Sequence, residues 1–150
     1  MEFLKFFLKQ QIKIEAGNQK AQEAKQTLIS ETKHQLKIAN DAGDEIAEIR
    51  LLNQLGNVYA YYSDFGLSDT IYHQGLAMAR QIPDKHLEAI ALVNLGLSYK
   101  NRLDYKQAYS YYQKAARISR ELKDRDLEQE VDEHINELSN MLDIEKLSKE

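Results

Sequence analysis

The sequence contains no cysteine and no tryptophan, and only one proline and six glycines among its 150 residues. Without cysteine the chain can form neither disulfides nor zinc–thiolate sites, and thiol catalysis is excluded. A cysteine-free chain suits a reducing compartment, so we expect a cytoplasmic protein. No stretch has the composition of a flexible linker, and a chain of this length is enough to bury one core. We therefore expect a single helix-rich domain over 1–150.

The sequence also lacks the features of several function classes. No uninterrupted apolar run approaches the roughly 20 residues that span a bilayer, so no membrane span is expected. The net charge of −4 comes without a concentrated basic face, which argues against a nucleic-acid partner. There is no glycine-rich phosphate loop, nucleophile elbow or paired-carboxylate motif. We therefore expect no enzyme, no catalytic residue and no cofactor.

Histidine is sparse, with four residues and no close histidine or cysteine companion for any of them. Glu130 and His134 come nearest to a metal motif, since their spacing of i, i+4 places them on one face of a predicted helix. An ion pair within the helix explains this spacing more simply. We therefore expect no metal site.

The beginning of the sequence, over 1–16, is rich in phenylalanine and lysine. Its apolar spacing predicts a helix over 2–16, and the lysines at 5, 9 and 13 share one face of it. Such a helix can lie on a membrane surface or pack on its neighbour, and we favour packing. Gly17-Asn18 tolerates left-handed backbone angles, so we expect a helix break there and a second helix over 19–41.

Helical periodicity and turn residues predict five further helices. In several of the turns, glycine or proline ends a helix and aspartate can cap the next one. The turns contain Gly43-Asp44, Ser63-Asp64-Phe65-Gly66, Pro83-Asp84 and Lys123-Asp124. The predicted helices span 45–62, 67–81, 85–101, 105–122 and 126–146.

A 40-residue repeat is the strongest signal in the chain. Placing 47–91 on 87–131 aligns 11 identical residues in 45 pairs, whereas unrelated chains would share about three at roughly 6% chance identity. Such a period indicates stacked helix pairs, none of which can bury its apolar face alone. The identical pairs include Leu55/Leu95, Gly56/Gly96, Tyr59/Tyr99, Tyr72/Tyr112, Arg80/Arg120 and Glu88/Glu128.

In each copy, a Leu-Gly pair and a tyrosine on the first helix are followed by small residues and a tyrosine on the second. We expect Gly56 and Gly96 to lie where the partner helix crosses closely, because glycine has no side chain. This pattern resembles the tetratricopeptide repeat in its 40-residue variant. The residues that carry the resemblance are Leu52, Leu55, Gly56, Tyr59, Ser68, Tyr72 and Gly75 in one copy and Leu92, Leu95, Gly96, Tyr99, Ala108, Tyr112 and Ala115 in the next.

The resemblance implies an all-α fold: a TPR-like solenoid, a right-handed superhelix of about three antiparallel helix pairs plus a C-terminal capping helix. It covers 45–128 strongly and the rest of the chain weakly. On this basis the domain divides into a degenerate first helix pair (1–43), two repeats (44–83 and 84–123), and a capping helix with a tail (124–150).

The resemblance also implies a concave groove that is lined by the first helix of each pair and binds a peptide or a helix of another protein. Amides suit this task because each offers a donor and an acceptor to a peptide backbone. Asn94, directly before Leu-Gly, matches a position where family members hold the ligand main chain, and Gln54 could act likewise. By position in the repeat, the groove residues would be Arg50, Asn53, Gln54, Asn57, Tyr61, Asn94, Leu97, Lys100, Asn101 and His134, with Glu130 and Glu137 nearby.

Some members of this family grip a C-terminal carboxylate with lysine, asparagine and arginine. Asn57 and Asn94 match two asparagines of that clamp, but Asn53, Glu130 and His134 stand at its cationic positions. Because Glu130 would repel a carboxylate, we do not expect this clamp here.

We therefore expect a non-catalytic scaffold for protein–protein interaction, with Tyr61 as a candidate hot spot. Two alternatives stay open. One is a self-associating scaffold whose N-terminal or C-terminal helix mates with a copy, and the other is a peptide-sensing module of a regulatory system. The last helix carries an apolar stripe that could cover the end of the repeat stack or pair with a copy, and we favour the cap. The stripe consists of Leu127, Val131, Ile135, Leu138 and Leu142.

Overall fold

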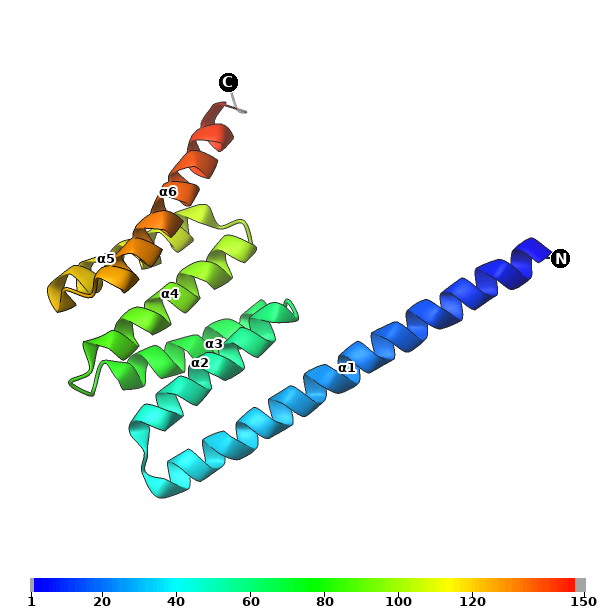
Figure 1. The fold of residues 1–150 in the computed structure, drawn as a ribbon, viewed down its shortest axis with the longest axis horizontal. Coiled ribbons are helices and arrows are strands. Elements are labelled where there is room, and N and C mark those ends of the chain that lie inside the picture. The colour runs from blue at the N-terminus through cyan, green and yellow to red at the C-terminus, as the bar shows by residue number, and fades with distance from the viewer. Residues whose placement is uncertain (1, 148–150) are drawn as a thin grey trace.

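The computed structural model describes the backbone of residues 2–147 and the side chains of 15–143. Over this range the chain forms six α-helices joined by short turns and no strand, so the fold class is all-α, as predicted (Figure 1). None of these helices is long and apolar enough to cross a bilayer. The helices are α1 (Glu2–Ala42), α2 (Glu45–Tyr61), α3 (Phe65–Ala79), α4 (Lys85–Asn101), α5 (Tyr105–Leu122) and α6 (Arg125–Leu147).

The predicted break at Gly17-Asn18 is wrong, because α1 runs unbroken through both residues and 1–43 is not a helix pair. A Cβ at Gly17 would meet nothing within 4 Å, so no neighbour forces a turn there. Gly43 shows the contrast: its φ is +68°, and the N–H of Asp44 donates to Ala39 O over 3.0 Å, which closes α1. The described chain therefore contains two complete helix pairs, α2–α3 and α4–α5, flanked by single helices.

Only the C-terminal part of α1 packs against the repeats among its described side chains. Ile29, Thr32 and Ala39 are buried there, whereas every residue from 15 to 24 is exposed. The N-terminal part projects away from the body (Figure 1). Lys25 marks the transition, since its ammonium group pairs with the carboxylate of Asp64. The predicted packing of 2–16 on a neighbouring helix concerns side chains that lie almost entirely outside the described range.

Aspartates begin the later helices, as the turns at 43–44, 83–84 and 123–124 predict; Asp104 does the same without having been predicted. The side chains of Asp44, Asp84, Asp104 and Asp124 each accept a hydrogen bond from a backbone N–H in the first turn of the following helix. Asp64 precedes α3 without capping it, because its carboxylate is paired with Lys25 of α1 instead. This difference ties α1 to the turn between α2 and α3.

Each repeat packs a tyrosine ring directly on a glycine. A Cβ at Gly56 would lie 2.4 Å from Cε1 of Tyr72, and one at Gly96 would lie 2.5 Å from Cε1 of Tyr112. Both rings are almost fully buried. The identical glycine and tyrosine pairs of the repeat are therefore the two sides of one contact between the helices of a pair.

The two tyrosine hydroxyls differ in their surroundings. The Tyr72 hydroxyl donates a hydrogen bond to Oδ1 of Asn57. The equivalent acceptor position in the next repeat is Leu97, and the buried Tyr112 hydroxyl has no hydrogen-bond partner among the described residues. Burial raises the pKa of Tyr72 to about 12 and raises the pKa of Tyr112 further. Both hydroxyls therefore stay protonated at neutral pH.

This difference predicts opposite results for two conservative substitutions. Tyr72→Phe removes a hydrogen bond and is expected to lower the free energy of unfolding by about 1 kcal/mol. Tyr112→Phe removes a buried hydroxyl without a partner and is expected to leave stability unchanged or to raise it. Urea unfolding followed by circular dichroism measures both. Equal losses in the two variants would contradict this prediction.

A second repeated contact joins each repeat to the helix that follows it. Nε of Arg80 lies 2.9 Å from Oε1 of Glu88, and Nε of Arg120 lies 3.0 Å from Oε1 of Glu128. Burial alone would raise the pKa of Glu88, but hydrogen bonds from Lys85 and Arg80 outweigh it, so its pKa is lowered. The arginine and glutamate identities are therefore explained by one ion pair across each boundary.

The apolar stripe of α6 packs on the repeat before it. Leu127, Val131 and Leu138 are buried, and Ile135 packs beside them in the same core as Tyr112 of α5. From Leu127 to Leu138 the stripe is therefore covered within the chain.

Another face of α6 is polar where the repeats are apolar. Asp132 takes the repeat position of Leu92, and Asn136 takes that of Gly96. Asp132 is partly exposed and pairs with Arg120. A helix packed on α6 as α5 packs on α4 would meet these polar groups instead of a leucine and a glycine.

Candidate functional site

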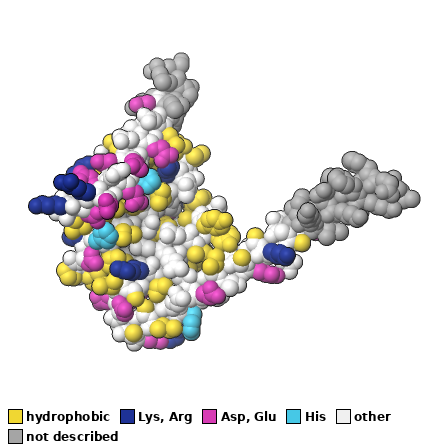
Figure 2. Space-filling model, in the orientation of Figure 1, with side chains coloured by type: hydrophobic (Ala, Val, Ile, Leu, Met, Phe, Trp, Pro, Cys, Tyr) yellow, Lys and Arg dark blue, Asp and Glu magenta, His cyan; other side chains and the backbone are white. Residues whose placement is uncertain are grey.

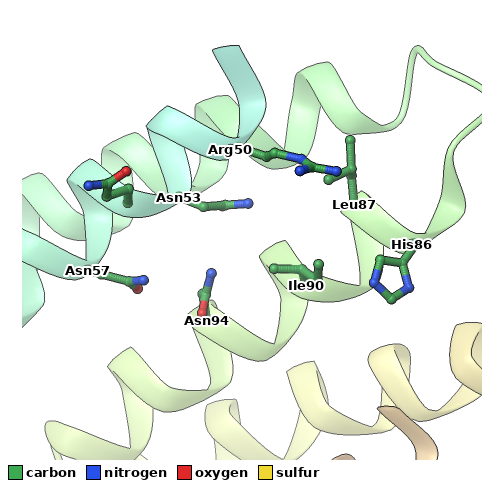
Figure 3. A pocket seen from close by; sticks show the side chains of 8 residues that line it. Arg50, Asn53, Asn57, His86, Leu87, Ile90 and Asn94 are labelled. Atoms are coloured by element: carbon green, nitrogen blue, oxygen red, sulfur yellow. The ribbon is translucent and has the colours of Figure 1, made fainter. Parts of the chain in front are cut away.

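A cleft of about 510 Å³ lies between α2 and α4, the first helices of the two repeats. This volume is within the range of the pockets in which proteins bind small ligands. Five of the predicted groove residues come together here. The lining residues are Arg50, Asn53, Gln54 and Asn57 from α2, and His86, Leu87, Ile90 and Asn94 from α4 (Figure 3).

The buried side of α2 determines which residues face the cleft. Arg50, Asn53 and Asn57 follow spacings of three and four residues, which place them on one side of the helix. Leu52 and Leu55 are 1% exposed and pack into the core. Because the leucines fix the rotation of the helix, the polar residues must face α4.

Asn53 is the most enclosed polar side chain of the cleft, at 6% exposed. Its Oδ1 has no hydrogen-bond partner among the described residues and faces α3, where a Cβ on Gly75 would lie 3.4 Å away. Its amide nitrogen points into the space between α2 and α4, and the side chains of Asn57 and Asn94 point into the same space (Figure 3). The cleft thus presents several amides to one ligand.

Arg50 supplies a positive charge at one end of the cleft. None of the ion pairs between described side chains includes Arg50. The other titratable group is His86, whose Nδ1 lies 3.2 Å from Oδ2 of Asp124. The histidine therefore has an acidic neighbour within the protein, whereas the guanidinium is available to a ligand.

An apolar hollow of about 290 Å³ adjoins the other end of the cleft. Tyr61 is 82% exposed, and its ring meets that of Tyr62 edge to face with the centroids 5.1 Å apart. Figure 2 shows hydrophobic side chains gathered where the end of α2 faces α1. The hollow is lined by Leu28, Gln54, Asn57, Val58, Tyr61 and Tyr62.

A second hollow, of about 230 Å³, places Leu97 and Asn101 of α4 beside Asn57 and Tyr61. Asn57 borders the cleft and both hollows. The three spaces therefore form one continuous surface along α2. Eight of the ten predicted groove residues border it.

The other two predicted groove residues lie elsewhere. The ammonium group of Lys100 pairs with the carboxylate of Glu137, and its hydrogen bond lowers the pKa of that carboxyl. The His134 ring stacks on Tyr112 with the centroids 4.9 Å apart and the planes 11° apart. Neither residue borders the three spaces. Among the described residues, no group of three histidine, cysteine or acidic side chains could hold a metal ion.

Sequence reasoning missed His86, Leu87 and Ile90 of the cleft wall and Leu28 of the hollow. Ile90 takes the repeat position of Arg50, so applying the repeat to Arg50 would have found it. His86 lies at the start of α4, one turn earlier on the same side as Ile90. Leu28 comes from α1, which has no clear repeat register, and no sequence signal points to it.

Comparisons with known proteins agree with this architecture. The family model of the tetratricopeptide repeat matches residues 45–121. The crystal structure of BtubC (BKLC) from P. vanneervenii is similar, with a TM-score of 0.71, 19% identity and 79% of this chain covered. The chain spans 50% of that protein, and at this identity the likeness shows the fold alone. A comparison with curated proteins found no match. The family match extends from the start of α2 almost to the end of α5, over half of the chain, and this protein belongs to the tetratricopeptide repeat family.

Proposed function

We propose that this protein is a non-catalytic binding module that holds an extended peptide of a partner protein in the cleft between α2 and α4. Repeats of this family generally mediate protein–protein interactions. The observation that carries the proposal is the convergence of amide side chains, including the enclosed Asn53, on one open cleft. A peptide-sensing role in a regulatory system would use the same cleft.

An extended peptide suits this surface because its backbone repeats donors and acceptors about every 3.3 Å. Amides can pair with both kinds of group, and successive cleft residues of α2 lie roughly one turn, or about 5 Å, apart. The surface therefore offers regularly spaced hydrogen-bonding groups along one direction. Catalytic chemistry has no support in the cleft, where the titratable side chains are one arginine and one histidine.

The Gln54→Ala/Asn94→Ala double variant tests this proposal. Peptides of 12 random residues, displayed on phage and selected on the wild-type protein, are expected to bind the variant at least tenfold more weakly because hydrogen bonds to their backbone are lost. Fluorescence anisotropy of the selected peptides gives the affinities. The side chains of Gln54 and Asn94 take part in no hydrogen bond with the described residues, so thermal unfolding should not change.

The matched control is Gln74→Ala/Gln113→Ala, which removes two exposed amides from α3 and α5. It should bind the selected peptides as the wild type does. The proposal fails if no peptide is enriched, or if both double variants bind the enriched peptides equally.

The projecting part of α1 favours a second candidate, self-association. A helix that is exposed on every side from 15 to 24 gains little stability on its own. The segment before it is rich in phenylalanine and leucine, although its side chains lie outside the described range. A second copy could bury such a segment.

If this candidate is right, Phe6→Glu/Phe7→Glu converts a dimer into a monomer, because two charges would then be buried at the contact. Sedimentation velocity at protein concentrations from micromolar to a hundredfold higher measures the mass in solution, with Lys5→Glu/Lys9→Glu as the control on the polar face. A wild-type protein that is monomeric over this range rules the candidate out.

A further inference from the structure

The two ends of the binding surface on α2 have opposite chemistry. Arg50 stands at one end with a positive charge, and Tyr61 stands at the other beside an apolar hollow. Gln54 and Asn57 lie between them and border both the cleft and the hollow. The surface therefore has a direction, which a ligand of suitable sequence would match.

The cationic end is suited to a carboxylate. Arg50 has no ion-pair partner among the described side chains, and its guanidinium extends toward Leu87 (Figure 3). Leu87 and Ile90 form an apolar wall beside it. A guanidinium binds a carboxylate through two parallel hydrogen bonds, and the interaction is stronger where apolar neighbours exclude water.

The apolar end is suited to one large side chain. Leu28 is 44% exposed and Tyr61 is 82% exposed, so covering them would remove apolar surface from water. Val58 and the ring of Tyr62 complete the hollow, whose volume of about 290 Å³ accommodates a leucine or an aromatic ring. An exposed tyrosine that can be covered in this way is a frequent hot spot.

The distance between the two ends determines how far apart the acidic and the apolar residue of the ligand must be. Arg50 and Tyr61 are three helical turns apart on α2, which corresponds to about 16 Å at roughly 1.5 Å per residue. An extended peptide covers this distance in about five residues. The flexible arginine side chain adds about one residue of tolerance on either side.

We infer that the partner segment carries an aspartate or glutamate that binds Arg50 and a large apolar residue, four to six positions away, that fills the hollow beside Tyr61. This inference rests on the proposed function, since the amides between the two ends would hold the backbone of the same segment. The carboxylate that binds Arg50 belongs to a side chain within the segment and is not the C-terminal carboxylate of the partner.

Peptide selection on charge-reversed protein tests the inference. The same random library is selected in parallel on the wild type, Arg50→Glu, Tyr61→Ala and the control Arg117→Glu, which reverses an exposed charge on α5. Wild type and control should enrich peptides with the acidic–apolar pair. Arg50→Glu should enrich lysine or arginine at the acidic position and bind wild-type peptides at least tenfold more weakly. Tyr61→Ala should keep the acidic residue and lose the apolar preference.

The outcomes separate this inference from the proposed function. Peptides that depend on Gln54 and Asn94 but lack the acidic–apolar pair would overturn the inference and leave the function standing. The inference also fails, and the function again stands, if the pair is enriched but Arg50→Glu does not change it. If no peptide depends on Gln54 and Asn94, the proposed function fails first. Binding of a short oligothymidine in place of peptides would overturn both.

Discussion

Gly96→Ala is expected to lower the free energy of unfolding by about 2 kcal/mol through overpacking, although alanine is the better helix former. The added Cβ would lie 2.5 Å from Cε1 and 2.7 Å from Cδ1 of Tyr112. That ring is 0% exposed and stacks on His134, so it cannot move away cheaply. Because the ring is held in place, the cost of overpacking lies at the upper end of its usual range, at about 3 kcal/mol. Alanine regains roughly 1 kcal/mol through its helix propensity, which leaves a net loss of about 2 kcal/mol. Urea unfolding followed by circular dichroism measures the loss.

Two further variants show whether steric contact is the cause. Gly17→Ala places the same methyl group in a helix with no neighbour within 4 Å, and it should cost nothing. Gly96→Ala/Tyr112→Leu removes the ring that the methyl group meets. Its loss should be smaller than the sum of the two single losses by about 1 kcal/mol or more. A Gly96→Ala protein as stable as the wild type would refute the contact as the reason for the repeated glycine.

Arg102→Ala is expected to cost about 2 kcal/mol, because it breaks a largely buried ion pair that joins the second repeat to the first. Nη2 of Arg102 lies 2.8 Å from Oδ2 of Asp69 in α3, and its guanidinium lies 4.1 Å from the ring centroid of Tyr99. The two charged side chains are 26% and 19% exposed. Removing the arginine leaves the carboxylate with the Ser98 hydroxyl as its one side-chain donor among the described residues, and it also removes a cation–π contact.

The exposed pair between Lys37 and Asp41 provides the control, since its side chains are 71% and 61% exposed. Lys37→Ala should cost less than about 0.5 kcal/mol, because water and salt screen such a pair. Arg102→Lys should recover only part of the loss, since an ammonium group cannot stack flat on Tyr99. Thermal unfolding at low and high salt compares the three. Equal losses for Arg102→Ala and Lys37→Ala would show that burial does not strengthen the contact.

The sequence predicts α2 to α5 well because both residues of each contact between paired helices recur in the repeat. Gly96 and Tyr112 recur together, so a single shift of one repeat aligns both the glycine and the ring that covers it. The first helix gives no such information. Gly17 permits a helix break but does not require one. A break would be stabilised only if the segment before Gly17 folded back and packed an apolar face on the repeats. A permissive residue alone does not predict a turn.

The site was predictable to the extent that the rotation of a helix determines which side chains face outward. Arg50, Asn53 and Asn94 reach the cleft because the leucines beside them are buried. The sequence does not show which outward residues find partners within the chain. Lys100 of α4 pairs with Glu137 of α6, and His134 of α6 stacks on Tyr112 of α5. Both contacts form because α6 lies within reach of these two side chains. Such contacts depend on the distance between helices, which the spacing of residues along one helix does not encode.

The boundaries between repeats have a consequence for how the chain can be lengthened. The boundary between residues 83 and 84 and the boundary between 123 and 124 have the same three residues around them. Each has an arginine before it, a capping aspartate just after it, and a glutamate that binds the arginine. A duplicate of 84–123 inserted after residue 123 would therefore find a matching junction on both sides, and α6 would still lie on a copy of α5. Gene duplication or protein engineering could extend the binding surface one whole repeat at a time from within the array, leaving both flanking helices unchanged.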